Sequence, residues 1–120
     1  MNLQDNFTCE DDINELKQVQ PELLIVLAWS IKYCKKNTLR CCVTSLVRCV
    51  DSFSVSNTHQ TGRAFDLSVK GWSNQDIEDY TLFMTQKCNE YAAINTSGEK
   101  RLIVHHDVKG DHLHHQVRNC

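Results

Sequence analysis

The chain has 120 residues, 41% of them hydrophobic and 23% charged, and 13 basic against 15 acidic side chains leave a formal net charge of −2. A chain of this length is expected to form one domain that buries about two thirds of its unfolded surface, so its core needs no obligatory disulfides. The near balance of charge argues against nucleic acid as a partner, because non-specific binding needs a surplus of Lys and Arg. We expect a single domain over residues 1–120, with residues 1–10 as a loose N-terminal lead-in.

The N-terminus and the longest apolar run bear on where the protein acts. Residues 1–12 are acidic and lack the basic and apolar regions of a secretory signal. The longest unbroken apolar run covers residues 23–29, far short of the roughly 20 residues that span a bilayer. We therefore expect synthesis in the cytoplasm without a signal peptide, and no membrane insertion.

The seven cysteines are an odd number, so they cannot all pair within one chain. The spacing of those between positions 34 and 49 contains no C-x2-C motif, which argues against a structural zinc site there. Small buried or half-buried thiols in a reducing compartment are the expected state. A zinc or redox protein built on these cysteines is the alternative.

Helical patterns come first along the chain. Asp11 or Asp12 can cap a short helix that Pro21 ends, and Pro21 is then well placed to begin a second helix that runs to about Lys36. The second helix has apolar residues at helical spacing and basic residues at its C-terminal end. The thiol-rich and β-branched stretch Arg40–Val50 predicts a strand.

The middle of the chain alternates loop, strand and helix. Residues 51–61 are polar and predict a loop, and Gly62–Lys70 alternates as a strand does. Ser73 and Asp76 have the spacing of a capping box. The apolar pattern that follows predicts a helix to about Ala93, with its aromatic and Met residues in the core.

The last part of the chain predicts a β-hairpin. Two short strands, Arg101–His106 and Leu113–Val117, flank a turn over residues 107–111. Together these elements predict an α+β domain, with two or three helices packed on a small, mainly antiparallel sheet.

Histidines mark the expected site of chemistry. Five of the six lie within residues 105–115, and the sixth is His59, in the loop before the Gly62–Lys70 strand. If Gly62 turns the chain sharply, His59 and Asp66 can converge, and Ala64 keeps that side of the strand clear for a ligand. Imidazole nitrogen and carboxylate oxygen both bind Zn²⁺. A loop histidine and a solvent-facing aspartate are the alternative.

A third zinc ligand is expected from the second strand of the hairpin. His112 and His114 share one face of that strand, while Leu113 turns away into the core, so either histidine can complete the site. Two His and one Asp leave a tetrahedral position open for water, as catalytic zinc requires. Asp111 can then act as general base and acid; a simple turn residue after Gly110 is the alternative.

These residues match a known motif pair. His59-x-x-Gly62-x-Ala64-x-Asp66 followed by Asp111-x-x-His114 resembles the zinc D-alanyl-D-alanine carboxypeptidase family, which includes the D-Ala-D-Ala dipeptidases of vancomycin resistance and the L-alanyl-D-glutamate endopeptidases of phage endolysins. The resemblance implies a D-Ala-D-Ala peptidase/hedgehog-like fold and a peptidoglycan peptide as substrate. It also implies zinc at His59, Asp66 and His114, and it assigns Asp111 as the general base and acid.

A third match lies upstream, in Val43-Thr44-Ser45-Leu46-Val47-Arg48. It resembles the family pattern (V/I)-T-S-x-x-R and implies that Arg48 stabilises the oxyanion of the tetrahedral intermediate. An ordinary solvated charge is the alternative. The chain departs from the family in having Asn57 where a Ser is usual, and Leu46 and Val47 where Gly and Tyr are frequent.

The predicted function is therefore a zinc-dependent peptidase of peptidoglycan stem peptides, monomeric and of phage-lysin type, that acts on the bacterial cell wall after release. The alternative is a non-catalytic zinc-containing module of the same fold, with a cell-wall-binding or structural role. The bond that is cut stays open between D-Ala-D-Ala, L-Ala-D-Glu and a cross-bridge. His105, His106 and His115 are expected to be exposed or near the zinc site without binding it.

Overall fold

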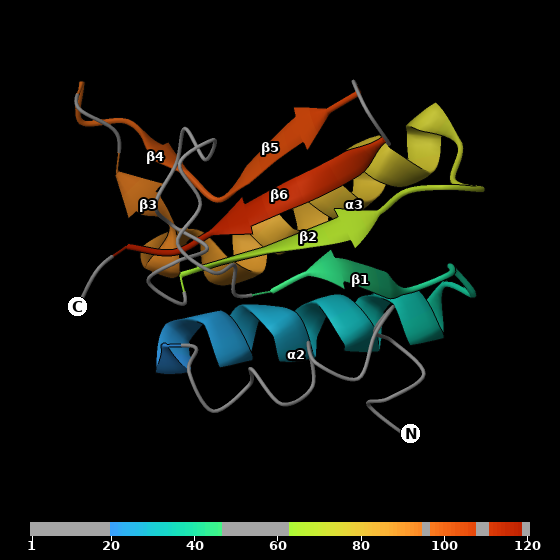
Figure 1. The fold of residues 1–120 in the computed structure, drawn as a ribbon, viewed down its shortest axis with the longest axis horizontal. Coiled ribbons are helices and arrows are strands. Elements are labelled where there is room, and N and C mark those ends of the chain that lie inside the picture. Colours follow the sequence, from blue (N-terminus) through green and yellow to red (C-terminus); the bar gives the residue numbers. More distant parts are fainter. Residues whose placement is uncertain (1–19, 47–62, 95–96, 108–110, 119–120) are drawn as a thin grey trace.

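The computed structural model describes residues 20–46, 63–94, 97–107 and 111–118. Within them, a four-stranded antiparallel sheet has the order β1-β2-β6-β5 (Figure 1). The main elements are α2 (Pro21–Lys36), β1 (Cys42–Ser45), β2 (Ala64–Ser68), α3 (Asn74–Cys88), β5 (Ile103–His106) and β6 (His112–Gln116). The predicted α+β class with a mainly antiparallel sheet is confirmed. The helix predicted before Pro21 and the loop over residues 51–61 lie outside the described residues.

Helix α2 has the predicted bounds. Pro21 occupies its first turn, where the missing N–H is not needed, and Glu22 there and Lys35 and Lys36 in the last turn suit the helix dipole. One face is buried at the spacing of an amphipathic helix, through Leu23, Val26, Leu27, Ser30, Ile31 and Cys34. Burial of this face attaches the helix to the core.

Helix α3 begins with the predicted capping box. The Asp76 backbone N–H donates to Ser73 Oγ at 3.0 Å, and the Ser73 N–H donates to Asp76 Oδ2 at 2.9 Å. The helix ends at Cys88 rather than near Ala93, and a 3-10 turn over Asn89–Tyr91 follows. The prediction was too long because the chain becomes extended at residue 92, which forms a β-bridge with residue 117.

Three strands of the main sheet, β1, β2 and β5, are shorter than the sequence predicts, whereas β6 has the predicted length and begins one residue earlier. Strand β1 covers only part of the predicted Arg40–Val50, and the residues after 46 are not described. The predicted hairpin is confirmed as the antiparallel pair β5–β6. A separate two-stranded ribbon of β3 (Ala93–Ile94) and β4 (Lys100–Arg101) was not predicted.

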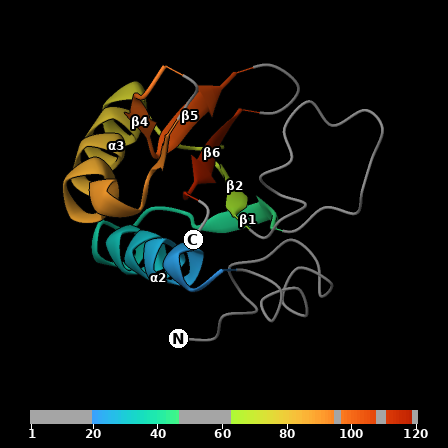
Figure 2. The ribbon, with the colours of Figure 1, turned by 90° about the vertical axis from the view of Figure 1, so that its left-hand side faces the viewer.

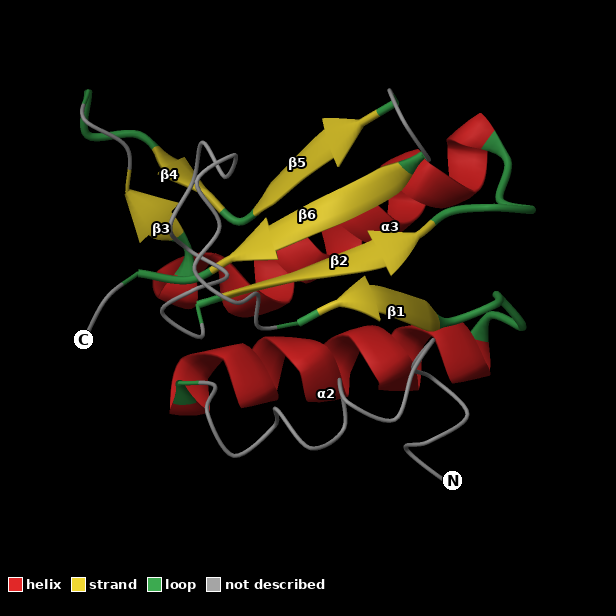
Figure 3. Ribbon diagram, in the orientation of Figure 1, coloured by secondary structure: helices red, strands yellow, loops and turns green. Residues whose placement is uncertain are grey.

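The two helices lie together on one face of the sheet (Figures 2 and 3). The core fills the space between the helices and the sheet. It includes Phe65 and Leu67 of β2, Leu113 of β6, and Tyr80 and Met84 of α3. The predicted core role of the aromatic and Met residues of α3 is thus confirmed for its buried members. In the described part of the chain, no helix has the length and apolar character to cross a membrane.

Candidate functional site

The register of the sheet brings two predicted zinc ligands together. Strand β6 lies between β2 and β5, and His114 in it is the direct antiparallel partner of Asp66 in β2. Directly opposed residues of an antiparallel pair point to the same face. Asp66 and His114 are therefore neighbours in space although they are far apart along the chain.

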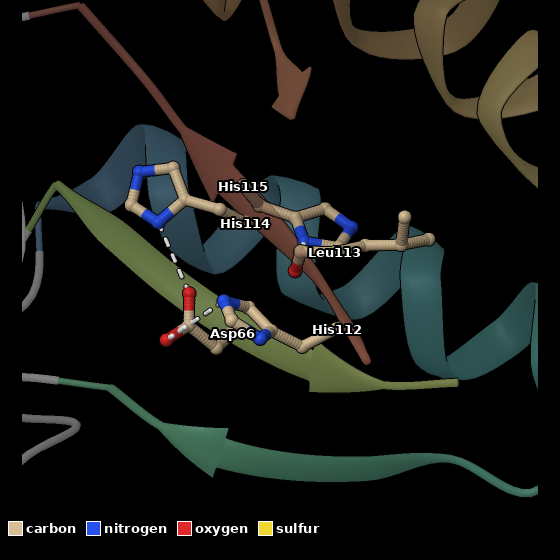
Figure 4. A network of polar contacts seen from close by, with 5 residues as sticks. All are labelled: Asp66, His112, Leu113, His114 and His115. Carbon is tan, nitrogen blue, oxygen red and sulfur yellow. Dashed lines mark hydrogen bonds and ion pairs between the residues drawn. The ribbon is translucent and has the colours of Figure 1, made fainter. Parts of the chain in front are cut away.

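The two side chains form a buried contact (Figure 4). His114 Nδ1 lies 3.0 Å from Asp66 Oδ1, within hydrogen-bond range, and His112 Nε2 lies 4.0 Å from Asp66 Oδ2. Asp66 is only 3% exposed and His114 8%. A buried carboxylate is costly unless it is paired, and the two imidazoles help to make this position tolerable for Asp66.

The predicted alternation along β6 is confirmed. His112 and His114 both turn toward Asp66, whereas Leu113 is fully buried on the helix-covered face (Figure 4). The expectation that Ala64 leaves the β2 face open is not met, because Ala64 is fully buried and Asp66 nearly so. The pairing of β2 with β6 places His112 and His114 over the carboxylate of Asp66.

A further histidine, His106, joins this group from β5. Its ring stacks on that of His112, with centroids 5.1 Å apart, and meets His114 edge-on at 6.0 Å. Partial burial, with the neighbouring His112 and His114, lowers the pKa of His106. The sequence does contain a signal for this position of His106. In a hairpin centred on residue 109 of the predicted turn, His106 and His112 are equally far from the centre and are therefore expected to pair, as they do.

His115 lies on the opposite face and belongs to the core. Its Nδ1 donates to the Leu113 carbonyl at 3.0 Å, which leaves Nε2 to accept from the Tyr80 hydroxyl at 2.6 Å. The Ser30 hydroxyl lies 2.6 Å from that of Tyr80 and completes the chain of hydrogen bonds. Burial lowers the pKa of His115 to about 3, so the ring stays neutral and stacks on Phe65 with centroids 4.2 Å apart.

Asp111, the predicted general base, lies apart from Asp66 and His114. Its carboxylate contacts Nε2 of His105, and the two side chains are 48% and 41% exposed. His105 is the register partner of Leu113, on the face opposite His114. In an extended strand, a spacing of three residues puts two side chains on opposite faces, which accounts for the separation of Asp111 from His114.

Two predicted site residues, His59 and Arg48, lie outside the described residues, as does Gly62. Both belong to the segment that joins β1 to β2 along the sequence. Their predicted roles as zinc ligand and oxyanion donor therefore stay predictions.

The donor set partly fits zinc. Ligand atoms about 2.0–2.2 Å from a tetrahedral ion are roughly 3.3 Å apart, close to the 3.0 Å between His114 Nδ1 and Asp66 Oδ1. A metal ion could replace the proton that these two atoms share, because imidazole nitrogen and carboxylate oxygen are both atom types that bind zinc. Within residues 20–46, 63–94, 97–107 and 111–118, no group of three or more His, Cys, Asp or Glu side chains is arranged to hold a metal ion. Asp66 and His114 would supply two of the predicted donors, and the predicted third is His59.

The two faces of the sheet therefore differ. On one face, imidazoles meet the carboxylate of Asp66, whereas the helix-covered face holds the neutral ring of His115. Comparisons with protein-family models, with curated proteins and with solved structures find no match for the chain. A function for this face has to be argued from its own side chains.

Proposed function

We propose that the protein is a zinc-dependent peptidase that hydrolyses a peptide bond in peptidoglycan stem peptides, of the D-Ala-D-Ala carboxypeptidase or L-Ala-D-Glu endopeptidase type. The observation that carries the proposal is the buried contact between Asp66 and His114. These residues come from two separate motifs, and a carboxylate and an imidazole that meet out of water are typical of a functional site. The D-Ala-D-Ala peptidase/hedgehog-like fold is part of the same proposal.

Each site residue has a distinct role in this proposal. His59, Asp66 and His114 hold the zinc, and the bound metal supplies Lewis-acid chemistry that activates water near neutral pH. Arg48 stabilises the negative charge that develops on the carbonyl oxygen of the substrate. His112 and His106 line the same face next to the ligands, and the His106 ring, which stacks on His112, meets the His114 ring edge-on and restricts its orientation.

Asp111 takes the proton of the attacking water and passes it to the leaving amine. This role requires its carboxylate to leave His105 and turn toward the face that carries Asp66. Both partners of the Asp111–His105 contact are about half exposed, so little packing opposes that movement. Exposed pairs of this kind contribute little to stability.

A second candidate is a zinc-containing module of the same fold without turnover, with a cell-wall-binding or structural role. The contact of Asp111 with His105 favours it, because the carboxylate is then occupied away from the metal ligands. In that case zinc would stabilise the sheet and no bond would be cut. Either candidate acts as a monomer on the bacterial cell wall, and a phage lysin released into contact with the wall suits the first.

The deciding experiment is digestion of purified peptidoglycan by the zinc-loaded protein, with mass analysis of the released ends. New D-Ala or D-Glu ends identify the bond and support the peptidase. His114→Ala should lose both zinc, measured by elemental analysis, and hydrolysis. The matched control His105→Ala removes a histidine from the other face and should retain zinc. Zinc at wild-type stoichiometry in His114→Ala would contradict the ligand assignment.

The variant Asp111→Asn separates the two candidates. As a general base and not a ligand, Asp111 should be dispensable for zinc binding, but its loss should lower turnover by roughly 10²–10⁴. Circular dichroism and zinc content serve as controls for folding and loading. Unchanged turnover would remove Asp111 from the mechanism. A wild-type protein that binds zinc and peptidoglycan but releases no new ends would establish the non-catalytic module.

A further inference from the structure

Two histidine rings stack across the β5–β6 hairpin, on the same face of the sheet as Asp66. His106 in β5 and His112 in β6 are direct register partners, and their ring centroids lie 5.1 Å apart. Directly opposed residues of an antiparallel pair point to the same face, so the contact follows from the register. Neither ring is among the predicted zinc ligands, so the stacked pair needs an explanation of its own.

The separation of the two rings suits a shared metal ion. Two imidazoles that bind one tetrahedral ion at about 2.0–2.1 Å have centroids roughly 5 Å apart, since each centroid lies about 1 Å behind its nitrogen atom. His106 and His112 are already at this separation, and their planes are inclined by 27°. Because rotation of an imidazole about χ2 is only weakly restricted, both rings can turn a nitrogen atom toward the same point.

Both rings are accessible to an ion from solvent. His106 is exposed and the side chain of His112 is 24% exposed, whereas Asp66 and His114 are buried. An ion can therefore reach the stacked pair without any movement of the core. Imidazole nitrogen suits Zn²⁺, Ni²⁺ and Cu²⁺, whereas Ca²⁺ and Mg²⁺ prefer oxygen ligands. The chemistry of the pair thus favours a divalent transition-metal ion.

The carboxylate of Asp66 adds negative charge beside this pair. Its Oδ1 faces Nδ1 of His114 at 3.0 Å, and its Oδ2 lies 4.0 Å from Nε2 of His112 (Figure 4). The second distance exceeds the roughly 3.3 Å between two ligands of a tetrahedral ion, so Asp66 is here a neighbouring charge and not a third donor. Among the residues that the structure describes, no three donor side chains are arranged around one ion. Two imidazoles and water molecules therefore have to make up the coordination.

We infer that His106 and His112 form a second metal site, which binds a divalent transition-metal ion through one nitrogen atom of each ring. The site is distinct from the predicted set of His59, Asp66 and His114, so it stands whether or not the protein is a peptidase. In the described sheet, β5 is an edge strand that pairs with β6. An ion held by both strands therefore links this edge to the middle of the sheet and stabilises the folded chain.

Equilibrium dialysis of the chelator-treated full chain against Zn²⁺ tests the site. His106→Ala and His112→Ala should each bind one equivalent fewer than the wild type, because one imidazole alone does not hold the ion. His105→Ala, which removes the neighbouring histidine of the opposite face, is the matched control and should bind as the wild type does. Wild-type stoichiometry in both His106→Ala and His112→Ala would overturn the inference.

The same measurement on His114→Ala separates this site from the proposed function. The equivalent that depends on His106 should remain in His114→Ala, because His114 is not one of its ligands. If His114→Ala kept every equivalent while His106→Ala lost one, the ligand set of the proposed peptidase would fail and the second site would stand. Loss of all bound zinc in folded His114→Ala would show a single site and refute the inference.

Ni²⁺ provides an independent test through stability and nuclear magnetic resonance. An excess of Ni²⁺ should raise the midpoint of thermal unfolding by at least about 5 °C more in the wild type than in His106→Ala. At low Ni²⁺, the ring signals of His106 and His112 should broaden and those of His105 should persist. Far-ultraviolet circular dichroism checks that each variant is folded. Equal midpoint shifts, or earlier broadening at His105, would contradict the assigned ligands.

Discussion

His114 and His115 are adjacent in β6, and the sheet gives them opposite surroundings. On one face, His114 meets the buried carboxylate of Asp66, with His112 and His106 nearby. On the other, His115 meets the hydroxyl of Tyr80 and the ring of Phe65, and its pKa falls to about 3 because burial disfavours its cation. The same residue type thus serves as a candidate ligand on one face and as a neutral core residue on the other.

The difference lies in the partner rather than in burial alone, because both histidines are largely buried. Beside His114 stands the Asp66 carboxylate, with which a metal ion could be shared, whereas burial keeps the ring of His115 neutral. Changes on the Asp66 face should therefore affect metal binding and turnover, and changes on the His115 face should affect stability. The predictions below test this separation.

The largest effect is expected from Asp66→Asn. The amide keeps the size of the side chain but loses the anionic oxygen that would bind zinc. Zinc affinity should fall more than 100-fold, since even residues that only support a ligand cost about 10–100-fold. A zinc-chelator competition assay measures the affinity. Asp79→Asn, an exposed aspartate of α3, is the matched control and should bind zinc as the wild type does. Equal affinities in the two variants would exclude Asp66 as a ligand.

Arg48→Ala tests whether the proposed active face extends to a residue outside the described ranges. Loss of an oxyanion donor should lower turnover by roughly 10²–10³, with zinc content and thermal stability nearly unchanged. Arg48→Lys should recover only part of that loss, because Lys keeps the charge without the planar fork. Arg101→Ala, a 57% exposed arginine, is the control. A drop below tenfold, or a loss of stability instead, would make Arg48 structural and Arg63 the next arginine to test.

The smallest effect concerns the pH dependence of stability and arises on the other face. The folded pKa of His115 is about 3, below its usual value near 6.5, so the unfolded chain takes up a proton first as the pH falls. Stability from this group is fully present above about pH 6.5 and is lost toward pH 3. Between pH 7 and 4.5 the loss should be roughly 2–3 kcal/mol.

Urea unfolding of the chelator-treated protein measures this loss, with His115→Leu as the comparison. The Leu variant cannot titrate at this position, so its stability should fall less with pH, although it loses the hydrogen bond to Tyr80. Other acidic groups contribute equally to both proteins and cancel in the difference. Identical pH slopes would mean that His115 is not the neutral core residue described above.

Much of the fold was predictable because its signals are local. Pro21 and the spacing of apolar residues set the start and the buried face of α2, and Ser73 with Asp76 set the start of α3. The alternation of His112, Leu113 and His114 correctly assigned their faces. These signals depend on the period of a helix or strand, which a single sequence displays directly.

The remaining features depend on contacts between distant segments. The burial of Asp66 follows from the position of β6 next to β2, which no local pattern encodes. Likewise, Tyr80 of α3 bonds His115 and is itself bonded by Ser30 of α2, so a histidine expected near the zinc site lies in the core. The contact of Asp111 with His105 differs from what the motif predicts, because three residues of extended chain place Asp111 and His114 on opposite faces.

The order of the strands has a kinetic consequence. Strand β6 is the last described strand along the chain, yet it lies in the middle of the sheet. Its pairing with β2 closes a long loop, and such non-local pairings form slowly. Neither β2 nor β5 can complete the sheet before β6 inserts between them. In a refolding experiment, the Asp66–His114 contact should therefore appear in the slowest phase, together with any affinity for metal, while the helical signal recovers earlier.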